Sequence, residues 1–129
     1  MPHVIVEYSA NIEADLSPDR LVDEIHQAAI TSGIAEPVAV RTRLKRREHY
    51  RVGDGSPENA FVHIDVRGRK GRTPEQKAGV VRGITDAVVR ELGVPPQSVE
   101  VLLIEVGREH WAFGGNLASQ QAPVSSSAP

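Results

Sequence analysis

The 129-residue chain has no cysteine, few aromatic residues and no long apolar run. Without cysteine there can be no disulfide and no thiolate metal ligand. Aromatic residues make up only 4% of the chain although 40% of it is hydrophobic, so the core has to be built from Val, Ile, Leu and Ala. No apolar run approaches the roughly 20 residues of a membrane span, and the first residues lack the layout of a signal peptide. The sequence predicts a soluble, cytoplasmic protein.

The charge balance gives no overall attraction to nucleic acid or to an anionic membrane, because the net charge is only -2. The basic run over residues 41–51 is either a solvated face or an anion-binding patch. With so few aromatic side chains to stack on bases, we expect no nucleic-acid partner. The histidines are scattered without metal-ligand spacing, and residues 67–72 lack the order of a phosphate loop, so we expect no metal and no cofactor.

The chain contains an internal repeat. Three short segments of the first half recur in the same order in the second half, at a nearly constant offset. One such match can arise by chance, but three matches in the same order indicate two copies of one unit, over about residues 2–50 and 60–119. The matching segments are Val4-Ile5-Val6-Glu7 with Val62-His63-Ile64-Asp65, Ser17-Pro18-Asp19 with Thr73-Pro74-Glu75, and Arg47-Glu48-His49 with Arg108-Glu109-His110.

Each copy has the pattern strand, helix, strand. In the first copy, apolar and polar residues alternate over residues 3–8, which is typical of a strand. A helix is predicted to begin after Ser17 as N-cap, with Pro18 at its first position, where a missing N–H costs nothing. Gly33 ends this helix, and a second strand follows from about Val38 to Leu44.

The second copy repeats this order with clearer signals. Its first strand is predicted over about Phe61 to Val66. Thr73 and Gln76 make a capping box for the helix, and Gly93 is the stop. A nearly uninterrupted apolar run from Val99 to Val106 then predicts a strand buried on both faces.

Two strands joined by a helical crossover are parallel, and the crossover is right-handed in nearly all cases. The predicted fold is therefore α/β: two tandem β-α-β units forming a four-stranded sheet with both helices on one face. The other face lacks a cover, so we expect a homo-oligomer. Residues 1–119 form the domain, residues 52–57 link the units, and residues 120–129, rich in Ser, Ala and Pro, are predicted to be a disordered tail.

Pro2 gives the chain an unusual potential base. Removal of Met1, which small second residues generally permit, would leave a secondary amine at the amino terminus. An ordinary α-amino group has a pKa of roughly 7.7 to 8.0, and an apolar pocket or nearby cations lower that value. Such an amine can act as a general base near neutral pH.

The sequence resembles the tautomerase superfamily over nearly its whole length. The opening, Pro2-His3-Val4-Ile5-Val6-Glu7-Tyr8-Ser9-Ala10-Asn11-Ile12, resembles the 5-carboxymethyl-2-hydroxymuconate isomerase family. The stretch Gly71–Lys77 and the ending His110–Ser119 resemble the 4-oxalocrotonate tautomerase family. The resemblance implies repeated β-α-β units, a trimer, and a cofactor-free keto–enol isomerase that uses an amino-terminal proline as base on a small dicarboxylate.

The resemblance also suggests site residues. Arg41 matches the strand arginine that polarises the substrate, and we favour it over Arg43 for that role. The two residues are two apart in a strand and share a face, where a guanidinium can bind a carboxylate through two hydrogen bonds. Their charge would also lower the pKa of Pro2. We expect Pro2 and Arg41 to be catalytic and Arg43 to bind substrate.

Two further residues are expected to bind substrate. Trp111 stands where the family has an active-site phenylalanine from a neighbouring unit, and Arg72 matches a carboxylate-binding arginine. The first-copy counterpart of Arg72 is not basic, so Arg72 lines either the proline pocket or its second-copy counterpart. Glu100 stands in place of Arg41 and Ala60 in place of Pro2, so the second unit should be catalytically silent.

Alternatives from other classes stay open. The chain could be a dehalogenase, hydratase or decarboxylase of the same superfamily, with a protonated proline as acid and Glu7 or Glu100 positioning water. It could also be an inactive oligomeric binding protein. The opening favours the carboxymethyl diacid as substrate, whereas the second half favours plain 2-hydroxymuconate.

Overall fold

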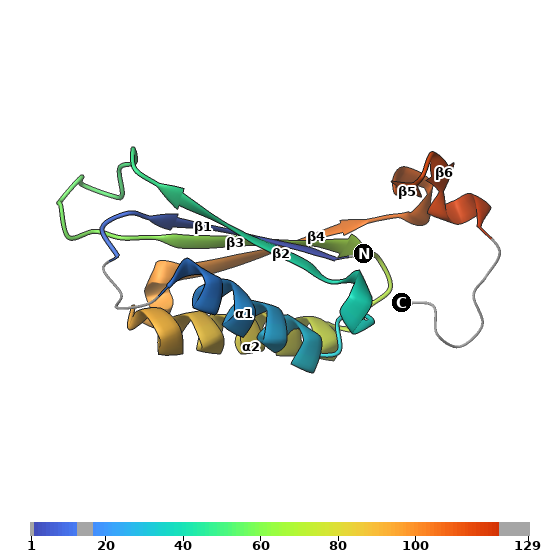
Figure 1. Ribbon diagram of the computed structural model, residues 1–129, viewed down its shortest axis with the longest axis horizontal. Helices are drawn as coiled ribbons and strands as arrows, with labels where there is room; N and C mark the ends of the chain where they lie inside the picture. Colours follow the sequence, from blue (N-terminus) through green and yellow to red (C-terminus); the bar gives the residue numbers. More distant parts are fainter. Residues whose placement is uncertain (1, 13–16, 122–129) are drawn as a thin grey trace.

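The computed structural model describes residues 2–12 and 17–121, which form two layers. One layer is a four-stranded sheet and the other is a pair of helices, α1 (Pro18–Thr31) and α2 (Pro74–Leu92). Figure 1 shows both helices against the same face of the sheet, with the opposite face open. This is the predicted α/β arrangement of two β-α-β units.

The strand order is β2-β1-β3-β4. β1 (His3–Ser9) pairs in parallel with β2 (Arg41–Arg47), and β3 (Val62–Arg69) pairs in parallel with β4 (Val99–Val106). β1 and β3 meet in the centre as antiparallel strands. The second unit therefore runs opposite to the first, and the residue before β1, Pro2, lies at the other end of the sheet from the start of β3.

Both helices begin and end as their sequences predict. The Ser17 side chain accepts a hydrogen bond from Arg20 N at 3.2 Å, which caps α1. At α2 the Thr73 hydroxyl accepts from Gln76 N while the Gln76 side chain accepts from Thr73 N, and Gly93 closes the helix at φ +67°. The positive φ is a conformation that glycine adopts without a steric penalty.

Aliphatic side chains join the two layers, as the shortage of aromatic residues predicts. The sheet supplies the even-numbered positions of β1 and β3, and the helices supply one face each. Tyr8, 9% exposed, is the aromatic exception in this core. The side chains that are 0% exposed in this core are Val4, Val6, Ile25, Ala29, Ile64, Ile84 and Val88.

The second strand begins later than predicted. We expected it from about Val38 to Leu44, but the residues Pro37–Ala39 form a short 3-10 turn, η1, and β2 follows it. Pro37 has no N–H to donate to a neighbouring strand. Ala39 N and Val40 N donate backward to Glu36 and Pro37, at 2.8 and 3.2 Å, so this backbone is satisfied locally and not in the sheet.

The strands of the second unit also differ from the prediction. β3 extends to Arg69, beyond the expected end at Val66, because it pairs with β4 along its whole length. β4 has the predicted bounds, but it is an edge strand and is not buried on both faces of a single chain. Leu102, on its open face, is 49% exposed.

After β4 the chain forms a small two-stranded hairpin, β5 (Ala112–Phe113) and β6 (Asn116–Leu117). Short 3-10 turns flank it, η3 (Arg108–His110) before and η4 (Ala118–Gln120) after. η4 extends one residue beyond the predicted domain limit, and the expected tail from residue 122 onward lies outside the described residues. Within the described part of the chain, no helix is both long and apolar enough to cross a membrane.

Candidate active site

Pro2 lies fully buried at one end of the sheet, directly before β1. Its carbonyl oxygen accepts a hydrogen bond from Arg41 N at 3.0 Å, which ties it to the start of β2. On its other side is Gly68 of β3, where a Cβ added to the glycine would lie 3.9 Å from the Pro2 Cβ. Pro2 therefore sits between the two strands that flank β1.

Arg41 and Arg43 share the open face of the sheet, as their spacing predicts. Arg41 pairs with His3 and Arg43 with Ile5 across β1 and β2. The Arg41 side chain is exposed and donates to the Ala39 carbonyl at 3.2 Å. Arg43 Nη1 donates to His3 Nδ1 at 2.8 Å. The structure thus brings both arginines to the end of the sheet that holds Pro2.

His3 is a residue of this site that sequence reasoning missed. Burial lowers its pKa, and the positive charges of Arg43 and Arg41 lower it further. The imidazole is therefore favoured in its neutral form. A histidine directly after the proposed base, in register with a strand arginine, is the signal that could have identified it, but that register is known only once β1 and β2 are paired.

Arg72 lies at the same end of the sheet as Pro2, and its part in a substrate pocket stays a prediction. A Cβ on Gly68 would lie 3.4 Å from Arg72 Nη1, and the same point is within 4 Å of Pro2. The guanidinium is already bonded, since Nε and Nη2 donate to the Ile34 carbonyl and Nη1 donates to Arg69 O at 2.8 Å. Burial lowers the pKa of Arg72 from its ordinary value.

Trp111 also lies at this end of the sheet, beside His3. Its ring centroid is 6.1 Å from that of His3, and the two ring planes are tilted by 40°. Trp111 O accepts from Ala118 N at 2.7 Å, and Arg108 donates to Ala118 O at 2.7 Å, which fixes this segment against the hairpin. The indole therefore provides an apolar side wall beside His3.

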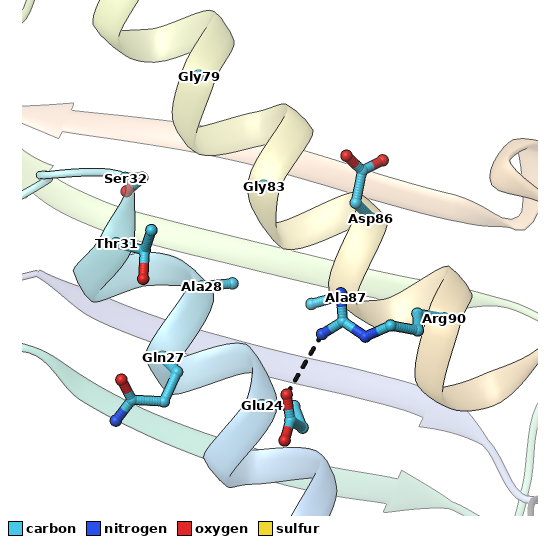
Figure 2. A pocket seen from close by; sticks show the side chains of 10 residues that line it. All are labelled: Glu24, Gln27, Ala28, Thr31, Ser32, Gly79, Gly83, Asp86, Ala87 and Arg90. Atoms are coloured by element: carbon cyan, nitrogen blue, oxygen red, sulfur yellow. Dashed lines mark hydrogen bonds and ion pairs between the residues drawn. The ribbon is translucent and has the colours of Figure 1, made fainter.

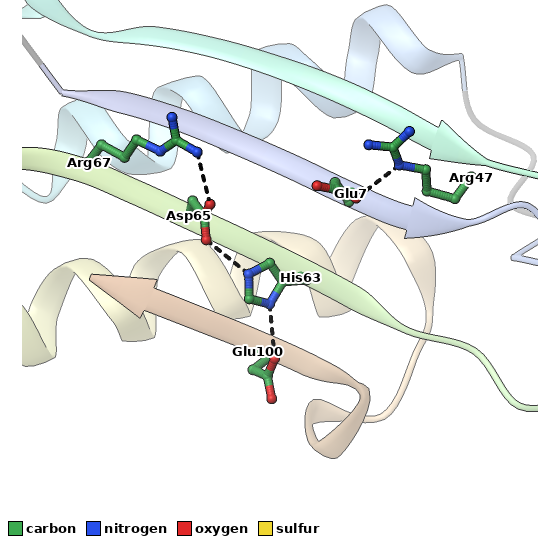
Figure 3. Close-up of polar contacts among 6 residues, drawn as sticks. All are labelled: Glu7, Arg47, His63, Asp65, Arg67 and Glu100. Carbon is green, nitrogen blue, oxygen red and sulfur yellow. Dashed lines mark hydrogen bonds and ion pairs between the residues drawn. The ribbon is translucent and has the colours of Figure 1, made fainter. Parts of the chain in front are cut away.

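The open face of the sheet carries paired charges, drawn in Figure 3. Glu7 accepts from Arg47 at 2.9 Å. His63 bridges Glu100 and Asp65, at 2.9 Å to each, and Asp65 also pairs with Arg67 at 3.3 Å. Glu7 and Glu100, the carboxylates considered for positioning water, are each engaged with a partner of their own.

The counterpart of the Pro2 site lies at the other end of the sheet. Ala60 lines a cleft of about 650 Å³ together with Asn11, Asn59 and residues after α2. Neither a basic residue nor a terminal amine is among its lining residues. The catalytic silence of the second unit stays a prediction.

A second cleft, of about 490 Å³, runs between the two helices on the side away from the sheet (Figure 2). Gly83 of α2 faces Ala28 of α1 there, since a Cβ added to the glycine would lie 3.8 Å from the Ala28 carbonyl oxygen. The Arg90–Glu24 ion pair, at 3.3 Å, crosses this cleft. Its lining contains none of the predicted site residues. Within residues 2–12 and 17–121, no group of three or more His, Asp or Glu could hold a metal ion.

Comparison with known proteins assigns the family. The chain belongs to the 5-carboxymethyl-2-hydroxymuconate isomerase family, whose model matches residues 2–104. A 2-hydroxymuconate tautomerase of Pseudomonas putida is 39% identical over 61 residues, which are 47% of this chain and 90% of that protein. A probable tautomerase of Lactiplantibacillus plantarum is 37% identical over 61 residues, 47% of this chain and 92% of its own. The prediction of an isomerase family is confirmed.

Solved structures share the fold. Native fused 4-OT superposes with a TM-score of 0.79 at 23% identity, covering 91% of this chain and 96% of its own. A symmetric trimer of fused 4-OT gives 0.78 at 21% identity, over 92% and 99%. A member of the cis-3-chloroacrylic acid dehalogenase family gives 0.72 at 24% identity, over 89% and 82%. Fused 4-OT and a member of the cis-3-chloroacrylic acid dehalogenase family therefore share this architecture, and the fold by itself does not select the reaction.

Proposed function

We propose that the chain is a cofactor-free keto–enol tautomerase of 2-hydroxymuconate-type unsaturated 2-oxo diacids, with Pro2 as general base once Met1 is removed. The observation that supports this most directly is the position of Pro2. Pro2 is fully buried, and its carbonyl oxygen accepts a hydrogen bond from Arg41 N. Its Cβ and the Arg72 guanidinium both lie within 4 Å of the place that a Cβ on Gly68 would take.

This position suits a base. Burial disfavours the charged ammonium form of an amine, and nearby guanidinium groups repel it, so both effects lower the pKa of a free Pro2 nitrogen toward neutrality. The neutral nitrogen would take the proton from the 2-hydroxyl group of a dienol and return it to a carbon of the conjugated chain. The product is the 2-oxo form, and no group other than the proton is transferred.

The arginines supply the electrostatic part of the reaction. Negative charge develops on the substrate oxygen as its proton leaves, and a fixed cation aimed at that oxygen lowers the barrier. Arg41 is proposed for this role because its backbone N–H donates to the Pro2 carbonyl and its side chain is exposed, donating to Ala39 O. Arg43 and Arg72 would bind the carboxylates, which favours a diacid substrate.

We further propose that the active assembly is a homotrimer. Three large apolar side chains of the described residues are exposed in the single chain: Val38 at 90%, Leu102 at 49% and Phe113 at 42%. The sheet face that bears Leu102 has no helix over it (Figure 1). Fused 4-OT, which shares the fold, forms symmetric and asymmetric trimers.

The decisive experiment is ultraviolet-monitored ketonisation of 2-hydroxymuconate and of its 5-carboxymethyl analogue. It uses purified protein whose loss of Met1 is confirmed by mass, beside the variant Pro2→Ala. We expect turnover by the wild type and its loss in the variant, and the ratio of kcat/KM values ranks the two diacids. Full activity in Pro2→Ala would contradict the proposal. Chloride release from a 3-haloacrylate without ketonisation would replace it with the dehalogenase alternative.

The role of Arg41 gives a separate prediction. Removing an oxyanion donor typically lowers kcat on the order of a hundredfold or more, so Arg41→Ala should lose at least that much. Lys45→Ala is the matched control, because Lys45 is a cation on the same strand and the same sheet face. Steady-state kinetics should show wild-type kcat in the control. An equal loss in both variants would mean that general positive charge matters and Arg41 has no specific role.

A further inference from the structure

His3, the residue directly after the proposed base, contacts two side chains on the open face of the sheet. Arg43 Nη1 lies 2.8 Å from His3 Nδ1, and the His3 ring lies 6.1 Å from the Trp111 ring, centroid to centroid. Arg43 belongs to β2, and Trp111 follows η3. His3 is therefore held between two separate elements, one residue after Pro2.

The contact between His3 and Arg43 requires a neutral imidazole. A guanidinium only donates hydrogen bonds, so Nδ1 has to accept, and it can do so only when the ring proton is on Nε2. Four cationic groups act on His3: Arg43 and Arg41 of β2, the terminal amine, and Arg67 of β3. Arg67 is itself paired with Asp65 at 3.3 Å. Burial and these cations lower the pKa of His3, which keeps the ring neutral at neutral pH.

We propose that His3 is a positioning residue: its neutral ring holds the Arg43 guanidinium in the orientation that binds the carboxylate of a diacid substrate farther from the 2-oxo group. The inference rests on the proposed function and adds to it the residue that fixes one end of the substrate.

The physical reason is pre-organisation. A free arginine side chain samples many rotamers, and that freedom is lost when it binds an anion. Bonded to His3, Arg43 has lost much of it before the substrate arrives. A guanidinium has five N–H donors, so one bond to His3 leaves enough for a carboxylate bound through two hydrogen bonds. Packing of His3 against Trp111 fixes the imidazole in turn.

Three substitutions of His3 test the roles of its two ring nitrogens separately. In His3→Asn the side-chain oxygen can take the place of Nδ1 and accept from Arg43. In His3→Gln the amide reaches the place of Nε2 instead, and His3→Phe keeps the ring beside Trp111 without either nitrogen. We expect KM for the diacid to rise about tenfold in the Gln and Phe variants, which is about 1.4 kcal/mol of binding, with kcat nearly unchanged. The Asn variant should retain a KM close to the wild-type value.

A double-mutant cycle tests whether His3 acts through Arg43. In an Arg43→Ala background, His3→Phe should cause no further rise in KM. A monoacid analogue, 2-hydroxy-2,4-pentadienoate, should show little effect of His3→Phe, because it lacks the second carboxylate. The inference is overturned if His3→Phe has the wild-type KM, if its effect persists in Arg43→Ala, or if only kcat falls.

A binding measurement keeps this test separate from that of the proposed function. The unreactive diacid muconate, titrated calorimetrically, should bind about tenfold more weakly to His3→Phe and with nearly wild-type affinity to His3→Asn. If the wild type binds muconate in this pattern but turns over no 2-hydroxymuconate, the proposed function fails and the role of His3 stands. If the wild type turns over the diacid and the three variants bind muconate equally, the role of His3 fails alone.

Discussion

His63 lies between two carboxylates on the open face of the sheet (Figure 3). Its hydrogen bond to Glu100 is the largest cause that raises its pKa, and Asp65 adds to the effect against the opposing cost of burial. His3 lies on the neighbouring β1, four residues before Glu7, the residue that pairs with His63. The pKa of His3 is lowered by burial and by arginines. Two histidines on one sheet face are thus shifted in opposite directions by their neighbours.

The raised pKa of His63 predicts a pH-dependent stability. Because the folded protein binds this proton more tightly than the unfolded chain, the stabilisation is complete below the unfolded pKa of about 6.5 and disappears as pH rises through the folded pKa. The difference in Tm between wild type and His63→Gln should therefore be larger at about pH 5.5 than at about pH 9. His49→Gln, at an exposed histidine, is the control and should show no such trend. A difference that grows with pH would contradict this interpretation.

How far the site follows from sequence differs from residue to residue. The resemblance identified Pro2, Arg41 and Arg72 separately, and the structure brings them to one end of the sheet. The resemblance could not decide which end of the sheet holds Arg72, because the position of Arg72 depends on the antiparallel pairing of β1 with β3. His3 was missed for a related reason: its partners come from β2 and from beyond β4, and no local pattern shows them. The catalytic roles of these residues stay predictions.

The start of α2 is the clearest local signal in the chain. Thr73 and Gln76 form a reciprocal capping box, with bonds of 3.1 and 2.8 Å. Two of the N–H groups that a helix leaves unsatisfied at its start are paired in this way. Since α2 covers β3 and β4 and leads from the Gly68–Arg72 segment, this cap also fixes the chain that follows the proposed site.

Loss of the cap should destabilise the fold by a measurable amount. Replacing an N-cap threonine by alanine typically costs about 1 kcal/mol, so Thr73→Ala should lower the free energy of unfolding by that amount. Thr73→Ser keeps the hydroxyl acceptor and should stay close to the wild type. Urea unfolding at one fixed protein concentration measures both, because association with other copies also contributes to stability. Equal stability of the Ala and Ser variants would show that the capping box contributes little to the free energy of unfolding.

Helix boundaries were predictable because caps, prolines and glycines act within a few residues. The bounds of β2 were not, because the apolar residues Val38 and Val40 suggested a strand where Pro37 starts a turn. The strand itself, Arg41–Arg47, is basic at five of its seven positions. It is a strand because β1 pairs with it, not because of its own propensity.

The whole molecule has one covered and one open sheet face. The predicted oligomer would cover the open face, and Leu102 tests this because it is the exposed apolar side chain in the middle of β4. Leu102→Glu should shift the mass measured by sedimentation velocity from a trimer toward a monomer, since a buried unpaired carboxylate is costly at an interface. Ala78→Glu, on an exposed helix position, should leave the mass unchanged. A monomeric wild type would overturn the proposed assembly.

The architecture as a whole was predictable because of the repeat. Two copies of one pattern, each a strand, a helix and a strand, allow few arrangements once crossovers are right-handed. The sequence did not specify that the two units meet through β1 and β3 in antiparallel order. That pairing is a contact between residues far apart in the chain, and it decides which ends of the units come together.

A tandem chain has two units but only one amino terminus. At the second unit, Ala60 occupies the position of Pro2, and even a proline there would be part of a peptide bond, whose nitrogen is not basic because its lone pair is delocalised into the carbonyl. Ala60→Pro should therefore add no turnover, whatever its neighbours. If the proposed base is correct, covalent fusion itself limits the protein to one working site per chain, and the other end of the sheet is released from selection for this chemistry.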